Sequence, residues 1–194
     1  MKKAGEMNVK RMMRSVAAGI FLACFGAAYA RAANFDTIVL SVTPGGINYA
    51  VQIASPEAQG YDFSSVNFGA TTVSTKAITV TNAGNAAEYF AMAVSGTSPD
   101  AWSPISSGTP GVNQFLMMGQ LLTSGSPQPA PSAFNVNNDT MTVTVPNTAG
   151  GRYGQSARTN PGTSKDLWLS LTMPSGASTA SQQTMTVTIN GQAN

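Results

Sequence analysis

The sequence predicts an all-β fold, an antiparallel β-sandwich of about eight strands. Many short segments alternate apolar with polar residues and are rich in β-branched side chains, which is the pattern of half-buried strands. Clusters of Gly, Pro, Asn and Ser separate these segments at the spacing expected of a sandwich. Only 9% of the residues are charged, which is typical of extracellular β proteins. Together these observations favour a secreted β domain.

The first 32 residues have the organisation of a secretory signal peptide. Five basic residues precede or flank the start of an apolar run, Val16–Ala28, and small-residue cleavage sites follow at Ala28-Tyr29-Ala30 and Ala30-Arg31-Ala32. The run is shorter than the roughly 20 residues of a transmembrane helix. An uncleaved anchor and lipidation at Cys24 remain alternatives. We therefore expect a signal peptide over 1–32, a single sandwich domain over 33–194, and a secreted, periplasmic or cell-surface location with no membrane span after cleavage.

Cleavage changes the charge and the cysteine content of the chain. The whole chain has ten Lys and Arg against eight Asp and Glu, and the mature part keeps four and seven, a net charge of −3. No basic patch remains, so a nucleic-acid partner is not expected. Cys24, the only cysteine, leaves with the leader. Stability must then come from the core or from assembly rather than from a disulfide.

Two strands are expected at the start of the mature chain, Asp36–Thr43 and Ile47–Ala54, separated by Pro44-Gly45-Gly46. One face of the first strand carries Ile38, Leu40 and Val42. Left free in water, this strand would expose a contiguous apolar edge. It either pairs with its own sheet or completes a neighbouring subunit by strand addition, so it is a candidate exchangeable strand.

The stretch Val66–Val94 organises the prediction for the rest of the chain. β-Branched residues dominate Val73–Asn82, and Asn82–Asn85 supplies residues that suit a turn. A further segment, Tyr89–Val94, resumes the alternation. Its inward face carries Phe90, Met92 and Val94. We expect one strand, a tight connection and a second strand that returns antiparallel.

This stretch also resembles a known group of modules. Val66-Asn67-Phe68-Gly69 followed by Lys76–Asn85 is similar to the strand pair of bacterial secreted immunoglobulin-like β-sandwich modules of the ASPM/SPD-2/Hydin (ASH)-like group. The resemblance covers about thirty residues. It implies an immunoglobulin-like sandwich with a structural or adhesive role and no catalytic motif. The whole chain bears a looser resemblance to the fibre-forming TasA/camelysin group.

Further strands are expected toward the C-terminus. Asn113–Leu122 suits a buried strand or a short helix, and we favour the strand. Gly125–Ser132 is a proline-rich linker that crosses between sheets or divides subdomains. Three later segments should face the core through apolar residues at every second position. These residues are Met141, Val143 and Val145, then Leu167, Leu169, Leu171 and Met173, then Met185, Val187 and Ile189.

The composition also limits the chemistry. The chain has no His, and the mature part no Cys, which removes a Ser-His-Asp triad, a thiol nucleophile and the usual zinc ligand sets. Two scattered carboxylates could form a glycosidase pair, but no motif supports one, and we expect no enzyme activity and no cofactor. Asn137-Asn138-Asp139 offers oxygen ligands for calcium, but a polar turn before a strand explains it better, so no metal site is predicted.

Two tryptophans are candidate contacts for a protein partner or a glycan. Trp168 lies on the face opposite the leucines of its strand, and Trp102 lies in a loop rich in Pro and Ser. Each is either exposed for stacking or packed, and we favour packing. The expected function is a secreted, non-catalytic structural or surface-assembly protein, a fibre or envelope subunit that binds copies of itself or other surface proteins. The alternative is an adhesin or carbohydrate-binding module.

Overall fold

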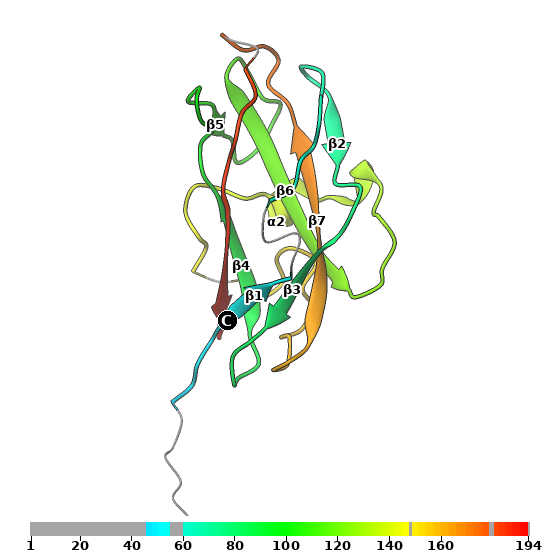
Figure 1. Cartoon of the computed structure of the whole chain (residues 1–194), viewed down its shortest axis with the longest axis vertical. Coiled ribbons are helices and arrows are strands. Elements are labelled where there is room, and N and C mark those ends of the chain that lie inside the picture. The colour runs from blue at the N-terminus through cyan, green and yellow to red at the C-terminus, as the bar shows by residue number, and fades with distance from the viewer. Residues whose placement is uncertain (1–45, 55–59, 148, 179–180, 194) are drawn as a thin grey trace, which may run out of the picture. The chain divides into compact units, whose positions relative to one another are not determined.

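The described part of the chain is a β-sandwich with two sheets (Figure 1). The computed structural model describes residues 46–54, 60–147, 149–178 and 181–193, all within one compact unit, Gly45–Asn194. The predicted signal peptide, the boundary at residue 33 and the strand Asp36–Thr43 lie outside the described residues. The eight described strands are β1 (Val51–Ile53), β2 (Thr71–Val73), β3 (Ile78–Asn82), β4 (Tyr89–Val94), β5 (Ser103–Pro104), β6 (Gln114–Thr123), β7 (Ser164–Thr172) and β8 (Val187–Gln192).

The larger sheet has six strands and is built on β7. Its order is β1-β3-β7-β6-β5, and β2 also pairs with β7 beyond the end of β3. All pairs are antiparallel except the short β5–β6 pair, which is parallel. The strand predicted over Asn113–Leu122 is confirmed as β6, since its alternating apolar residues are buried on both faces of the sheet. A sheet covered on both faces produces the nearly continuous apolar run that made this segment ambiguous.

The smaller sheet contains only β4 and β8 among the described residues. The two strands pair antiparallel, with Val94 opposite Val187 and Met92 opposite Ile189. The expected antiparallel return of the second central strand onto the first is therefore wrong as a pairing. β3 belongs to the larger sheet, and the Asn82–Asn85 turn takes the chain across to the smaller one. Alternation along a strand specifies its faces but not its partner, which explains the error.

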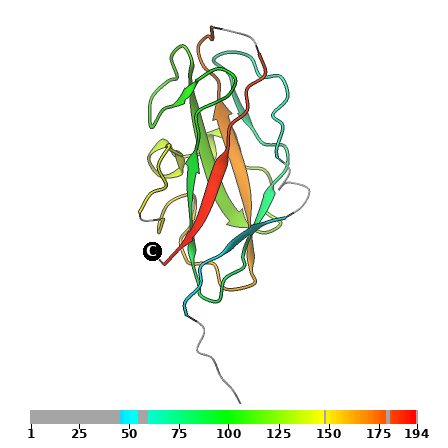
Figure 2. The same ribbon diagram turned by 60° about the vertical axis from the view of Figure 1, so that its left-hand side comes forward.

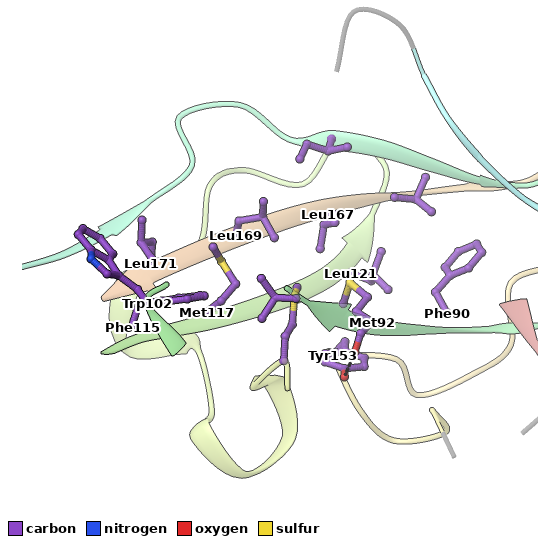
Figure 3. Close-up of a cluster of buried hydrophobic side chains, with 14 residues drawn as sticks. Phe90, Met92, Trp102, Phe115, Met117, Leu121, Tyr153, Leu167, Leu169 and Leu171 are labelled. Carbon is purple, nitrogen blue, oxygen red and sulfur yellow. Dashed lines mark hydrogen bonds between the residues drawn. The ribbon is translucent and has the colours of Figure 1, made fainter. Parts of the chain in front are cut away.

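The main core lies between the two sheets (Figure 3). Phe90, Met92 and Val94 from β4 meet Leu167, Leu169 and Leu171 from β7, as their alternation predicts. Gly119 of β6 allows this close packing, because a Cβ there would collide with the ends of Met141, Met92 and Leu167.

The segment after α2 (Val136–Asp139) closes one edge of the sandwich. The Met141 amide donates to the Met117 carbonyl of β6 at 2.9 Å, and the Val94 amide of β4 donates to the Thr142 carbonyl at 3.0 Å. Neighbouring residues thus bind different sheets. This geometry contradicts the expected strand with Met141, Val143 and Val145 on its inward face: Met141 is buried, but Val143 is 69% exposed, and the segment forms only isolated bridges. A chain that must span the gap between sheets cannot keep one face inward.

Two polar side chains strengthen this closed edge. The Tyr153 hydroxyl donates to the Met92 carbonyl at 3.0 Å. The Gln155 side chain accepts from the Phe90 amide at 2.8 Å and donates to the Phe90 carbonyl at 2.7 Å. The Phe90 amide and carbonyl, the Met92 carbonyl and the Val94 amide, on the outer edge of β4, are therefore all paired inside the protein, as burial favours.

The linker after β6 covers the outer face of the larger sheet. Its proline-rich part leads into a 3₁₀ turn, η2 (Pro131–Ala133), and then into α2. Phe134 and Val136 from this region pack with Val73, Leu116, Met118 and Trp168 in a second apolar cluster. The linker thus folds onto the same sandwich instead of separating two subdomains.

The strand expected over Ile47–Ala54 is shorter than predicted. Only β1, Val51–Ile53, forms a ladder, and Ile47 is 75% exposed. Residues 46–50 instead run along the Asn82–Asn85 turn, which binds them through backbone and Asn85 side-chain hydrogen bonds.

Candidate functional site

An apolar groove opens between the two sheets at the edge opposite the closed one. It has a volume of about 1260 Å³ and is bordered by β8 with the preceding residues 181–186 on one side and by residues 60–68 on the other. β8, the red strand in front in Figure 2, has β4 as its only strand partner among the described residues. The volume exceeds the roughly 300–1,000 Å³ of ordinary ligand pockets.

The floor of the groove is the main core itself. Leu167, Leu169 and Leu171 of β7 line it, and each is almost fully buried. Figure 3 shows these side chains side by side on one face of β7, with Trp102 at one end of the row. The wall on the β8 side is different, because Met185, Val187 and Ile189 pack on the core but remain partly exposed. The predicted inward face of this strand is confirmed, and its incomplete burial results from the groove beside it.

Among the described residues, the backbone of β8 has a strand partner on one edge only. The Ser95 amide donates to the Thr186 carbonyl, and Ala93 and Ala91 lie opposite Thr188 and Asn190. In an antiparallel ladder successive residues point their backbone groups to opposite sides. Even-numbered residues of this strand therefore bond to β4, and Val187 and Ile189 present their N–H and C=O groups to the groove.

The opposite wall is held in place by Tyr61. Its hydroxyl accepts from the Thr75 amide at 2.6 Å and lies 3.0 Å from the Thr75 hydroxyl, on the connection between β2 and β3. The Tyr61 ring packs edge-on against Phe63, with 4.8 Å between ring centroids. This wall is thus a fixed aromatic surface. Sequence reasoning missed it, although Tyr61 and Phe63 alternate with Asp62 in the manner of a strand.

The two candidate contact residues are both buried. Trp102 is 5% exposed and lines one end of the groove, and Trp168 is 6% exposed in the second apolar cluster on the outer face of the larger sheet. The structure therefore does not bring them together. Stacking on a sugar needs an exposed ring face, so this placement does not favour glycan binding through either indole. The candidate exchangeable residues Ile38, Leu40 and Val42 lie outside the described residues.

The groove is nearly free of charge. Asp62 is the only one of its lining residues that is charged at neutral pH, and no group of three or more His, Cys, Asp or Glu residues that could hold a metal occurs in the described chain. Asp139 of the considered calcium motif accepts hydrogen bonds from the Asn135 amide and the Gln120 side chain. Asp166 accepts from the Gly125 amide at the turn after β6. Both carboxylates thus stabilise loops.

Glu88 is an unusual acid beside the smaller sheet. It is fully buried just before β4, where it lies against Gly191 of β8. Neither carboxyl oxygen has a hydrogen-bonding partner of good geometry among the described residues. Burial raises the pKa of Glu88 from 4.5 to about 7, and the nearby backbone amide of Ala50 opposes this rise. Nothing in the sequence pattern around Glu88 indicated its burial.

A scan against protein-family models and a search of curated proteins find no match for this chain. Within the part of the chain that the structure describes, no helix is long and apolar enough to cross a membrane.

Proposed function

We propose that the protein is a non-catalytic structural subunit of a surface assembly, such as a fibre or an envelope layer. The observation that carries this proposal is the unpaired edge of β8 above an apolar groove. A two-stranded sheet is marginally stable by itself, and an exposed edge is a template for pairing with another chain. An additional strand there would complete the sandwich.

The chemistry of the groove supports assembly over catalysis or small-ligand binding. Its lining combines apolar and aromatic side chains with uncharged polar ones, and only Asp62 among the lining residues is charged at neutral pH. Such a surface offers burial of apolar area and backbone hydrogen bonds, the two terms that stabilise strand addition. The exported location expected from residues 1–32 fits this role, and the resemblance to ASH-like and TasA/camelysin-type modules agrees with it.

The proposal is tested by the assembly state of the purified mature protein. Sedimentation velocity and negative-stain electron microscopy over a range of concentrations should show growth from small species into regular polymers. Ile189→Thr, which makes the groove wall more polar, should weaken assembly, whereas Thr188→Val on the exposed face should not. A chain that remains monomeric at all concentrations, with or without these substitutions, would contradict the proposal.

A further inference from the structure

We infer that the groove beside β8 is the binding site for the segment Asp36–Thr43 of a second copy of this chain. This inference rests on the proposed function and names the partner segment. The segment would add as a new edge strand to the smaller sheet, with Ile38, Leu40 and Val42 turned inward.

The backbone of β8 supplies the first argument. Val187 and Ile189 direct their N–H and C=O groups toward the groove, and β4 is the only strand that pairs with β8 in the described chain. An incoming extended segment would satisfy these groups with backbone hydrogen bonds, which do not depend on sequence.

The side chains supply the second argument. In an added strand, Ile38, Leu40 and Val42 would lie beside the partly exposed Met185, Val187 and Ile189 and would face the aromatic wall across the groove. Val39 and Ser41 would share the outer face with Thr186 and Thr188. Eight residues in a strand extend about 26 Å, enough to run the length of β8. Residues 37–43 carry no charge, so binding would bring no ionised group onto the apolar floor.

The start of the described chain indicates why the strand comes from another copy. The Ala83 amide donates to the Ala50 carbonyl at 2.7 Å, and Asn85 donates through its amide to Asn48 at 3.0 Å and through its side chain to Gly46 at 2.9 Å. These bonds continue the line of β1 past the end of β3, so the chain leads outward to Gly46 (Figure 2). From this direction at Gly46, a strand formed by the preceding residues would reach a neighbouring molecule without a reversal of the chain, whereas a strand that filled the groove of its own molecule would need one.

Exposed Ile47 agrees with this direction. It is 75% exposed at the point where the chain leaves the sandwich, next to the two glycines. A neighbouring subunit that received the preceding strand would lie close to this side chain and bury it.

The test is a disulfide between the two strands in the full chain. Cys24→Ser removes the native thiol, and Ser41→Cys and Thr188→Cys place one cysteine on the outer face of each strand. Under oxidation, exchange should yield a ladder of covalent oligomers on a non-reducing gel, with the 41–188 link identified by mass spectrometry. Adding Leu40→Asp should reduce the amount of covalent oligomer at least tenfold. Adding Val39→Asp, on the outer face of the same strand, should leave that amount unchanged.

Each other outcome overturns the inference in a different way. A monomer with an internal 41–188 link would show that the chain fills its own groove. Folded protein, verified by its thermal transition, without either link, also when Val39→Cys replaces Ser41→Cys, would show that this segment does not bind beside β8. Regular polymers without the link would refute the inference but keep the proposed function. Absence of both the link and polymers would refute the two together.

Discussion

At the scale of single residues, adjacent positions of one strand have different surroundings. Thr186 and Val187 are neighbours, but the threonine is exposed and the valine packs on the core. Gly119 and Gly191 each leave room for a neighbouring side chain: a Cβ at Gly119 would collide with the end of Met141, and a Cβ at Gly191 with the Glu88 carboxylate. These contacts make specific substitutions informative.

Val187→Asp should destabilise the fold, and Thr186→Asp should not. The aspartate at 187 would place a charge against the leucines of β7 without a partner, at a cost of roughly 2–4 kcal/mol. Urea unfolding of both variants measures the difference. Equal loss in the two variants would refute the assigned faces of this segment.

Gly119→Ala should be destabilising by about 1–3 kcal/mol, because the new methyl group would overpack the contact of Met141, Met92 and Leu167. Gly176→Ala is the matched control, since the nearest atom to a Cβ there is 4.0 Å away. Thermal unfolding should show a lower Tm for the first variant only.

Glu88 should make the stability fall as the pH rises from about 4.5 to about 7. The folded state binds the proton more tightly than the unfolded state, so its advantage is complete below pH 4.5 and disappears above the folded pKa of about 7. The total change is about 3 kcal/mol. Unfolding of the wild type and of Glu88→Gln at pH 4, 5.5 and 8 isolates this effect. A Glu88→Gln variant with the same pH dependence as the wild type would contradict it.

At the scale of elements, the two edges of the sandwich differ. One edge is closed by the segment after α2, which bonds to β6 through Met141 and to β4 through Thr142. The other edge leaves β8 beside the groove. The larger sheet is covered on both faces, because Phe134 and Trp168 pack on its outer side.

Gln155→Met should weaken the closed edge. Gln155 satisfies both backbone groups of buried Phe90, and its loss would leave a donor and an acceptor without partners, at about 1–3 kcal/mol for each group. Gln52→Met, at an exposed position of β1, is the control. Hydrogen exchange should show faster opening at Phe90 in the first variant, and unchanged exchange would refute this role.

The sequence predicted elements better than their partners. The inward faces of Tyr89–Val94 and of the β7 leucines follow from period-two alternation, which the core enforces directly. The predicted pairing of β3 with β4 was wrong, because a short turn can also connect strands in two different sheets. The expectation that Val143 faces the core was wrong for a related reason. This segment closes an edge between the two sheets, and local sequence patterns do not encode that tertiary role.

At the scale of the whole molecule, the candidate site arises from unequal sheets. Six described strands face two, so the described part of the smaller sheet ends at β8 and leaves a groove between β8 and residues 60–68. No sequence motif indicates that one sheet has fewer strands than the other. Tyr61 and Phe63 form a wall of the groove only because β8 lies across from them. The alternating apolar residues of Asp36–Thr43 predict an exchangeable strand, but the segment lies outside the described residues, so this stays a prediction. The open edge of β8 could not be predicted, because it depends on the strand order.

The most direct test of this account is residue-resolved amide exchange along β8 in oligomers of the mature chain. The account predicts strong protection of Val187 and Ile189 in wild-type oligomers and rapid exchange in Leu40→Asp, while Thr188 and Asn190 stay protected by β4 in both. If Val187 and Ile189 exchange equally fast in the wild type and in Leu40→Asp, the edge of β8 is not completed by this strand, and the account is wrong.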